Sequence, residues 1–365
     1  MLFTLFSSRY HFFGKRGLLK FLYFFREEKM KTNSSCKRIN MDITHTLLPV
    51  VYISVFIIGL VANCWGIKSL IANWKKLGNI NVFILNLGVA DILYLVTLPF
   101  LVAYYSAGSR WVFGQVFCKM TRFCFNLNLY GSIGFLTCIS VYRYLSIVHS
   151  LRVMGRINAG HTKVITALVW ILVCAQSVPD MFYEKTRSNA TEKCFDTTSN
   201  SYLKDYLNYS FAWTISGFCL PLLIILGCYG HVAVVLYSKT NINQVIKQRC
   251  LRLVFIVTLL FSVCYTPYHI LKNLNLITRI WKSEGTCRDW FATVYIAQQV
   301  SRALVSLNSA INPLIYFHGN EDVFRIPRLC DRAQHYAPQT FGHPSKQEAA
   351  TPLQIQQSNH HAVVE

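Results

Sequence analysis

The chain has 365 residues and a formal net charge of +20, yet hydrophobic residues make up 53% of it and charged residues only 14%. This composition is too apolar for an ordinary soluble protein of that length. Most basic residues lie in short segments between long apolar runs, a distribution that argues against nucleic-acid binding and for a membrane protein.

Residues 1–46 precede the first apolar run long enough to cross a membrane, and we expect them to form an extracellular amino-terminal segment. Within residues 1–30, basic residues interrupt the apolar stretches, so no signal-peptide core is evident. A basic segment ahead of the first span also opposes the orientation inferred below. Our hypothesis is that residues 1–30 are an extension, translated only when initiation occurs upstream of Met30.

Seven apolar stretches follow, each with about 20 residues or more, which is enough to cross about 30 Å of hydrocarbon. They cover residues 47–71, 80–104, 115–147, 164–183, 207–237, 252–278 and 291–317. The sequence therefore predicts an all-α membrane protein with a seven-transmembrane helix bundle over residues 47–317.

Charge between the spans predicts the orientation of the bundle. Basic residues follow the first, third, fifth and seventh spans, whereas the loop at 184–205 balances its cations with acidic residues. The positive-inside rule then places the carboxyl terminus in the cytosol and the amino terminus outside the plasma membrane. The sequons at Asn33 and Asn189 fall on the outer side, where we expect glycosylation.

Residues 318–365 form the predicted cytoplasmic tail. We expect a short amphipathic helix on the membrane surface from Glu321 to Cys330, followed by a disordered segment rich in Gln, Ser, His and Pro. Two alternatives stay open for Cys330, palmitoylation or an unmodified thiol.

Cysteines divide between the membrane and its two sides. Only Cys36, Cys118, Cys194 and Cys287 fall on the oxidising outer side, and these four allow three pairings. We favour Cys118 with Cys194 and Cys36 with Cys287, which would hold the mouth of the bundle around a site. No Cys-x-x-Cys pair occurs, which argues against zinc.

Three cations, Arg122, Lys272 and Arg302, lie within or at the rim of separate apolar spans. A cation in hydrocarbon is costly unless it faces a polar cavity or a partner. At about 1.5 Å per residue, all three lie in the outer third of the bundle. The sequence shows no evident intramembrane acid at that depth to neutralise them, so we predict one pocket for an anion. The alternative is that each cation snorkels separately to the outer headgroups.

Motifs follow one another in order along the spans. Residues 86–91 read Asn-Leu-Gly-Val-Ala-Asp, and span three ends in Tyr142-Arg143-Tyr144. Span six carries Cys264-Tyr265-Thr266-Pro267, and span seven closes with Asn312-Pro313-Leu314-Ile315-Tyr316. Over about 45–330, this series resembles the rhodopsin-like G-protein-coupled receptors.

The resemblance implies a receptor, not an enzyme, whose bundle switches conformation on ligand binding and activates a heterotrimeric G protein. The residues implied in that switch are Arg143, Tyr144, Tyr265, Pro267, Asn312, Pro313 and Tyr316. Tyr142 stands where the family has an acid, so a local ionic latch on Arg143 is not available. Prolines also permit kinks on four spans, at Pro179, Pro221, Pro267 and Pro313.

Asp91 places a carboxylate deep in span two, where it is costly unless neutralised or solvated. The resemblance implies that Ser132, Asn308 and Asn312 surround it. Two alternatives stay open: the group holds a sodium ion, or Asp91 is protonated within a water network. No other cofactor is expected.

Shorter strings narrow the resemblance. The residues 119–123, 194–199, 269–272 and 299–302 together are similar to the metabotropic purinoceptors, most of all their adenine-diphosphate branch. The resemblance implies that four residues contact phosphates or anchor the site: Arg122, His269, Lys272 and Arg302. It further implies a lid and neighbouring side chains, comprising Asp196, Thr197, Thr198, Asn275, Tyr295 and Gln299. Tyr130 could stack on a base.

Departures from that branch occur at Phe195, Asn126 and Gln298, and the loss of a tyrosine hydroxyl could change the preferred ligand. Our leading hypothesis is a receptor for an extracellular nucleotide that couples to phospholipase C and calcium release. The alternative is a receptor for a dicarboxylate such as succinate or oxoglutarate, which shares the string at 266–269. A transporter would need an internal repeat or paired broken helices, and the sequence shows neither.

Overall fold

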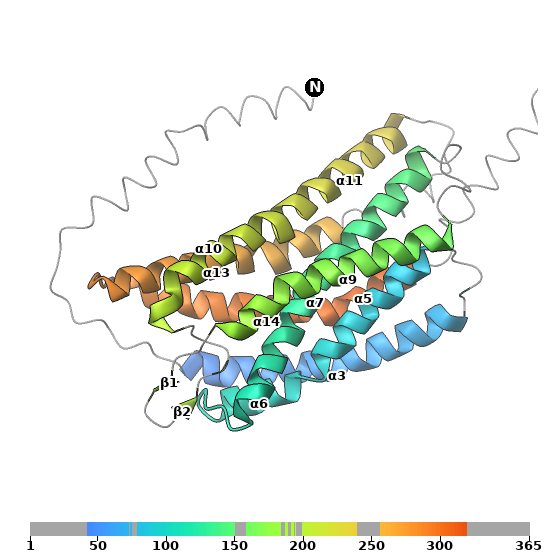
Figure 1. Cartoon of the computed structure of the whole chain (residues 1–365). Helices are drawn as coiled ribbons and strands as arrows, with labels where there is room; N and C mark the ends of the chain where they lie inside the picture. Colours follow the sequence, from blue (N-terminus) through green and yellow to red (C-terminus); the bar gives the residue numbers. More distant parts are fainter. Residues whose placement is uncertain are drawn as a thin grey trace, which may run out of the picture. The chain divides into compact units, whose positions relative to one another are not determined.

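The computed structural model describes residues 42–72, 74, 79–149, 158–183, 187–188, 191–192, 194, 199–238 and 256–319. The expectations for residues 1–41 and for the tail beyond 319 lie outside these ranges. Within them, seven long helical stretches pack side by side (Figure 1). All seven coincide with predicted spans, so the all-α bundle is confirmed.

The first four stretches begin and end close to the predicted bounds. They are α3 (Asp42–Ala72), α5 (Ile80–Leu95) with α6 (Leu98–Ser106), α7 (Gly114–Val148) and α9 (Ala159–Phe182). The fifth comprises α10 (Leu203–Thr214), η3 (Ile215–Cys219) and α11 (Leu220–Ser238). The last two are η4 (Phe261–Tyr265) with α13 (Thr266–Ser283), and α14 (Trp290–Gly319). In the loop after α9, β1 (Arg187–Ser188) pairs antiparallel with β2 (Thr191–Glu192), and η2 (Asn200–Tyr202) precedes α10.

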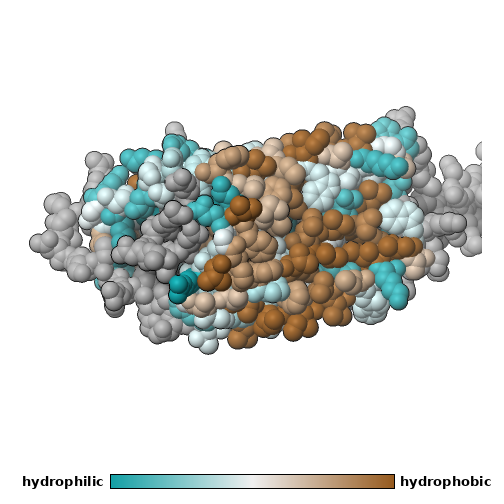
Figure 2. Space-filling view, turned by 60° about the horizontal axis from the view of Figure 1, so that its bottom comes forward, coloured by the Kyte–Doolittle hydropathy of each residue, from teal (hydrophilic) through white to brown (hydrophobic). Residues whose placement is uncertain are grey.

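Five stretches of the described chain are long and apolar enough to cross a membrane: Thr44–Ala72, Ile80–Ser106, Gly114–Val148, Ala159–Phe182 and Asn200–Ser238. Large apolar side chains such as Ile58, Ile171 and Leu223 point outward from them. Figure 2 shows the result on one face, where brown hydrophobic residues form a broad zone between teal hydrophilic ones. Such a surface suits hydrocarbon rather than water.

Two of the predicted proline kinks are accompanied by turns of π-helix. The π-helical segment η3 ends two residues before Pro221, and η4 ends two residues before Pro267. A proline has no N–H and clashes with the preceding turn, and a widened turn relieves this conflict. Span two is also interrupted, between α5 and α6, where Pro99 lies in the first turn of the new helix. This third break is not among the kinks predicted from the sequence.

Helix α7 is the most buried of the five apolar spans, and it contacts α5, α9 and α11. Polar contacts connect its neighbours: Asn63 Nδ2 of α3 donates to the Ser309 carbonyl of α14 at 2.8 Å, and Trp170 Nε1 of α9 donates to Asn86 Oδ1 of α5 at 2.8 Å. The central position of α7 places both of its buried arginines, Arg122 and Arg143, inside the bundle.

Candidate functional site

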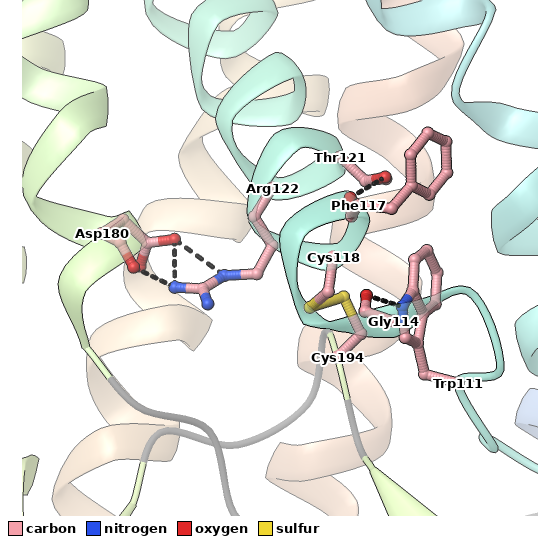
Figure 3. Close-up of a disulfide and its surroundings, with 8 residues drawn as sticks. All are labelled: Trp111, Gly114, Phe117, Cys118, Thr121, Arg122, Asp180 and Cys194. Atoms are coloured by element: carbon pink, nitrogen blue, oxygen red, sulfur yellow. Dashed lines mark hydrogen bonds and ion pairs between the residues drawn. A yellow bond between two sulfur atoms is a disulfide. The ribbon is translucent and has the colours of Figure 1, made fainter.

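One end of α7 is tied to the following loop by a disulfide, and we call this end of the bundle the outer end. Cys118 is bonded to Cys194, with the two Cα atoms 5.6 Å apart, which confirms the favoured pairing (Figure 3). Cys287 is disulfide-bonded as well, and its expected partner Cys36 lies outside the described residues.

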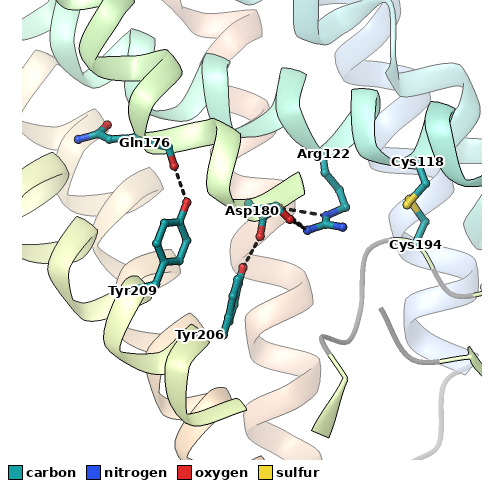
Figure 4. A network of polar contacts seen from close by, with 7 residues as sticks. All are labelled: Cys118, Arg122, Gln176, Asp180, Cys194, Tyr206 and Tyr209. Carbon is teal, nitrogen blue, oxygen red and sulfur yellow. Dashed lines mark hydrogen bonds and ion pairs between the residues drawn. A yellow bond between two sulfur atoms is a disulfide. The ribbon is translucent and has the colours of Figure 1, made fainter. Parts of the chain in front are cut away.

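Arg122 lies one turn below this disulfide and forms a buried ion pair with Asp180 of α9. The Asp180 Oδ2 atom accepts from Arg122 Nη2 at 2.6 Å and from Nε at 3.0 Å, and Nη2 also donates to the Asp180 carbonyl (Figures 3 and 4). The expectation that no acid at this depth neutralises the cations is therefore wrong. Because α9 runs antiparallel to α7, an acid in its last turn reaches the depth of a cation near the beginning of α7.

A third span joins this ion pair. Tyr206 of α10 donates its hydroxyl to Asp180 Oδ1 at 2.7 Å, and the nearby Tyr209 hydroxyl donates to the Gln176 carbonyl of α9 (Figure 4). Both carboxylate oxygens of Asp180 thus accept hydrogen bonds. The side chains of Arg122, Asp180 and Tyr206, which we call the outer triad, link spans three, four and five.

Lys272 of α13 lies beside the outer triad. Its Nζ atom is 5.7 Å from the centroid of the Tyr206 ring and 5.9 Å from that of the Tyr268 ring, within the range of cation–π attraction. Its charge interacts with those of Asp180, Arg302 and Arg122. The three cations found in the sequence therefore come together, with Asp180 among them.

Arg302 of α14 is 7% exposed and is oriented by polar neighbours. Its Nη1 atom donates to Gln299 Oε1 at 3.0 Å and to the Tyr105 hydroxyl of α6 at 3.4 Å. The Tyr105 hydroxyl itself donates to Gln299 Oε1 at 3.2 Å. These contacts hold the guanidinium between spans two and seven, and Tyr105 is a member of the site that the sequence did not indicate.

His269 lies one turn before Lys272 and is only 1% exposed. Its ring stacks on Phe218, with centroids 4.5 Å apart, and lies 6.1 Å from the Tyr130 ring. Neither ring nitrogen has a hydrogen-bond partner within the described residues, and the same holds for Gln298 Oε1. Buried polar atoms in this state are costly until a ligand or water pairs with them.

The remaining predicted contacts lie on the same two helices. Asn275 of α13 and Tyr295 of α14 are buried. The predicted lid residues Asp196, Thr197 and Thr198, like the sequons at Asn33 and Asn189, lie outside the described residues. The binding roles of all these side chains stay predictions.

Asp91 is held by amide groups deeper in the bundle. Asn128 Nδ2 donates to its Oδ1 atom at 2.8 Å, and Asn312 Nδ2 donates to its Oδ2 atom at 2.9 Å. Of these two amides, only Asn312 is expected from the sequence. Asn308 is buried, and neither polar atom of its side chain is paired within the part of the chain that the structure describes. The oxygens of Asp91, Ser132 and Asn308 are ligands of the kind that fit a sodium ion, whose presence stays a prediction.

Arg143 occupies the opposite, inner end of α7 and is 5% exposed. Among the described residues no acidic side chain pairs with it, and its Nη1 atom is buried without a hydrogen-bond partner. The next residue, Tyr144, places its hydroxyl 3.3 Å from His149 Nε2 and 3.2 Å from His231 Nδ1 of α11. This arrangement agrees with the absence of the acid at Tyr142. The predicted switch residues Tyr265 and Asn312 are also fully buried, whereas the Tyr316 side chain is outside the described set.

Comparison with known proteins now adds to this geometry. The model of the 7 transmembrane receptor (rhodopsin family) matches residues 62–316. The metabotropic purinoceptor 1 of Rattus norvegicus is 41% identical over 292 residues, 80% of this chain and 78% of that protein. The Homo sapiens receptor of the same name is 42% identical over 281 residues, 76% of this chain and 75% of that protein.

The metabotropic purinoceptor 4 of Xenopus laevis is 36% identical over 281 residues, 75% of this chain and 52% of that protein. These matches span the bundle that holds the three cations, the Asp91 group and Arg143. The chain therefore belongs to the rhodopsin family of seven-transmembrane receptors and, within it, to the metabotropic purinoceptors, as a multi-pass membrane receptor rather than an enzyme.

Proposed function

We propose that this receptor binds an extracellular nucleotide, with an adenine diphosphate as the first candidate, at the outer end of its bundle. The observation that carries the proposal is the convergence of Arg122, Lys272 and Arg302, whose charges all act on one another. Clustered cations inside a membrane bundle favour an anionic ligand. The names of its relatives as purinoceptors support a nucleotide as that anion.

Each group has a distinct part in this proposal. Lys272 supplies a compact charge for phosphate oxygens, and Arg302 offers a planar fork that suits them. His269, with both ring nitrogens unpaired among the described residues, can donate a further hydrogen bond to the ligand. The rings of Tyr130 and Tyr268 are near His269 and can stack on a base.

We further propose that the amino terminus is extracellular and that binding activates a heterotrimeric G protein, with phospholipase C and calcium release downstream. The buried, unlatched Arg143 at the inner end supports a contact with a transducer. The Asp91 group lies between the two ends, where a sodium ion bound to its oxygens would stabilise one conformation of the bundle.

A dicarboxylate is the second candidate ligand, and the outer triad is the observation that favours it. Three cations and one acid leave the described site with a net charge of +2, which balances the two charges of succinate or oxoglutarate. The relatives favour the nucleotide, so we place the dicarboxylate second.

A ligand panel in transfected cells tests both candidates. Calcium release is measured with adenine and uracil nucleotides and with succinate and oxoglutarate, and surface expression is measured in parallel. We expect a response to a nucleotide and none to either dicarboxylate. Silence to every nucleotide despite normal surface expression would reject the proposal, and a response to a dicarboxylate alone would replace it with the second candidate.

A further inference from the structure

Asp180 is an acid built into the centre of a cationic site. The residue is 4% exposed, and both carboxylate oxygens are engaged, Oδ2 by Arg122 and Oδ1 by Tyr206. A buried carboxylate with this many donors is held in its charged form and in one position. Its negative charge is therefore a permanent part of the site.

The ion pair also changes what Arg122 can do. Its Nε and Nη2 atoms, which would form the fork for a phosphate, both donate to Asp180. A guanidinium in this state has one edge occupied and its charge balanced. Arg122 therefore adds much less attraction for an anion than Lys272 or Arg302 does.

The charge of Asp180 also extends to the other cations. Asp180 acts on Lys272, whose ammonium faces the ring of the same Tyr206 that donates to the carboxylate. An anion bound between Lys272 and Arg302 therefore lies within reach of a fixed negative charge. Repulsion across a few ångströms is strong in a site with low dielectric constant, and it increases with each charge on the ligand.

We propose that Asp180 is a specificity-determining residue that limits the ligand's charge, so that the site prefers nucleoside mono- and diphosphates over triphosphates. This inference rests on the proposed nucleotide function and deepens it. The third phosphate of a triphosphate gains no second arginine fork from Arg122 and meets the Asp180 carboxylate. A ligand with fewer charges is balanced by Lys272 and Arg302 alone.

The test compares potencies of adenosine mono-, di- and triphosphate in membranes that contain the receptor, with nucleotide hydrolysis blocked and G-protein activation as the readout. The Asp180→Asn variant keeps the shape and an acceptor for Arg122 but removes the charge. We expect it to shift the triphosphate-to-diphosphate potency ratio toward the triphosphate by about tenfold or more, because one full charge inside the site is removed.

Two further variants separate charge from structure. Arg122→Gln with Asp180→Asn has the same net charge as the wild type, so the ratio should stay within about threefold of it even where absolute potency falls. Arg122→Gln alone lowers the net charge and should shift the ratio against the triphosphate. This variant decides the question if Asp180→Asn does not reach the surface.

Tyr206→Phe removes a hydrogen bond of the outer triad but leaves the charge, and it should leave the ratio unchanged. Parallel losses of potency for all three nucleotides in Asp180→Asn and Arg122→Gln would overturn the inference, because they indicate a structural role alone. If the wild type responds to no nucleotide, the proposed function itself fails. A normal nucleotide response with unshifted ratios rejects only the role of Asp180.

Discussion

Two arginines of α7 are buried to the same degree, each 5% exposed, but they are stabilised in different ways. At the outer end, Arg122 is paired with Asp180 and linked through it to Tyr206. At the inner end, Arg143 has a buried Nη1 atom without a partner among the described residues. A fully paired guanidinium fixes the helices around it, whereas one with an unmet donor favours a further contact. The outer end is thus built to hold helices together and the inner end to respond.

The largest effect should follow removal of the paired arginine. Arg122→Ala leaves the Asp180 carboxylate buried without its counter-ion, and loss of one partner of a buried pair costs about 3–5 kcal/mol. We expect a large fall in thermal stability of the purified receptor and in its surface expression. Lys119→Ala, an exposed residue of the same helix, is the control and should be close to neutral. Equal effects of the two substitutions would show that the pair does not stabilise the bundle.

The disulfide at the outer end should have the next largest effect. Cys118→Ser opens a link across 76 residues of sequence, and the loss of such a bond costs roughly 2–5 kcal/mol. We expect a lower midpoint of thermal unfolding and weaker agonist binding, since α7 loses its tie to the loop. Cys64→Ser, at an exposed free thiol, should change neither measurement.

Replacement of Lys272 should weaken ligand binding with little loss of stability. Lys272→Gln removes a charge that would bind phosphate, worth about 1.5–3 kcal/mol, which corresponds to roughly a ten- to hundredfold loss of agonist potency. The control is Lys282→Gln, at an exposed lysine in the last turn of the same helix. Unchanged potency in a Lys272→Gln receptor that reaches the surface would remove Lys272 from the site.

The smallest effect should come from supplying the acid that the inner end lacks. Tyr142→Asp offers Arg143 a neighbouring carboxylate, and a pair of this kind is worth about 1 kcal/mol when partly exposed. We expect basal signalling, measured as inositol phosphate without agonist, to fall about fivefold. Tyr142→Asn controls for loss of the ring. Equal basal signalling in the two variants would argue against a latch on Arg143.

Much of the fold could be predicted because a membrane imposes it on each span separately. About twenty apolar residues are needed for every crossing, so α3, α7 and α14 begin and end within about five residues of the predicted bounds. The depths of Arg122 and Lys272 could be counted along their helices. The breaks at η3 and η4 agree with prolines visible in the chain, although the π-helical form of the turns was not predictable.

The sequence by itself determined the helical spans, the pairing of Cys118 with Cys194, and the presence of three cations at one depth, because each depends on distances along the chain. Only the tertiary structure decided that Asp180 neutralises Arg122, that Tyr206 joins them, and that Asn128 rather than Ser132 donates most closely to Asp91. The physical reason is rotation: depth follows from residue number, but which side chains meet depends on how each helix turns about its axis against its neighbours. That packing is a property of the whole bundle.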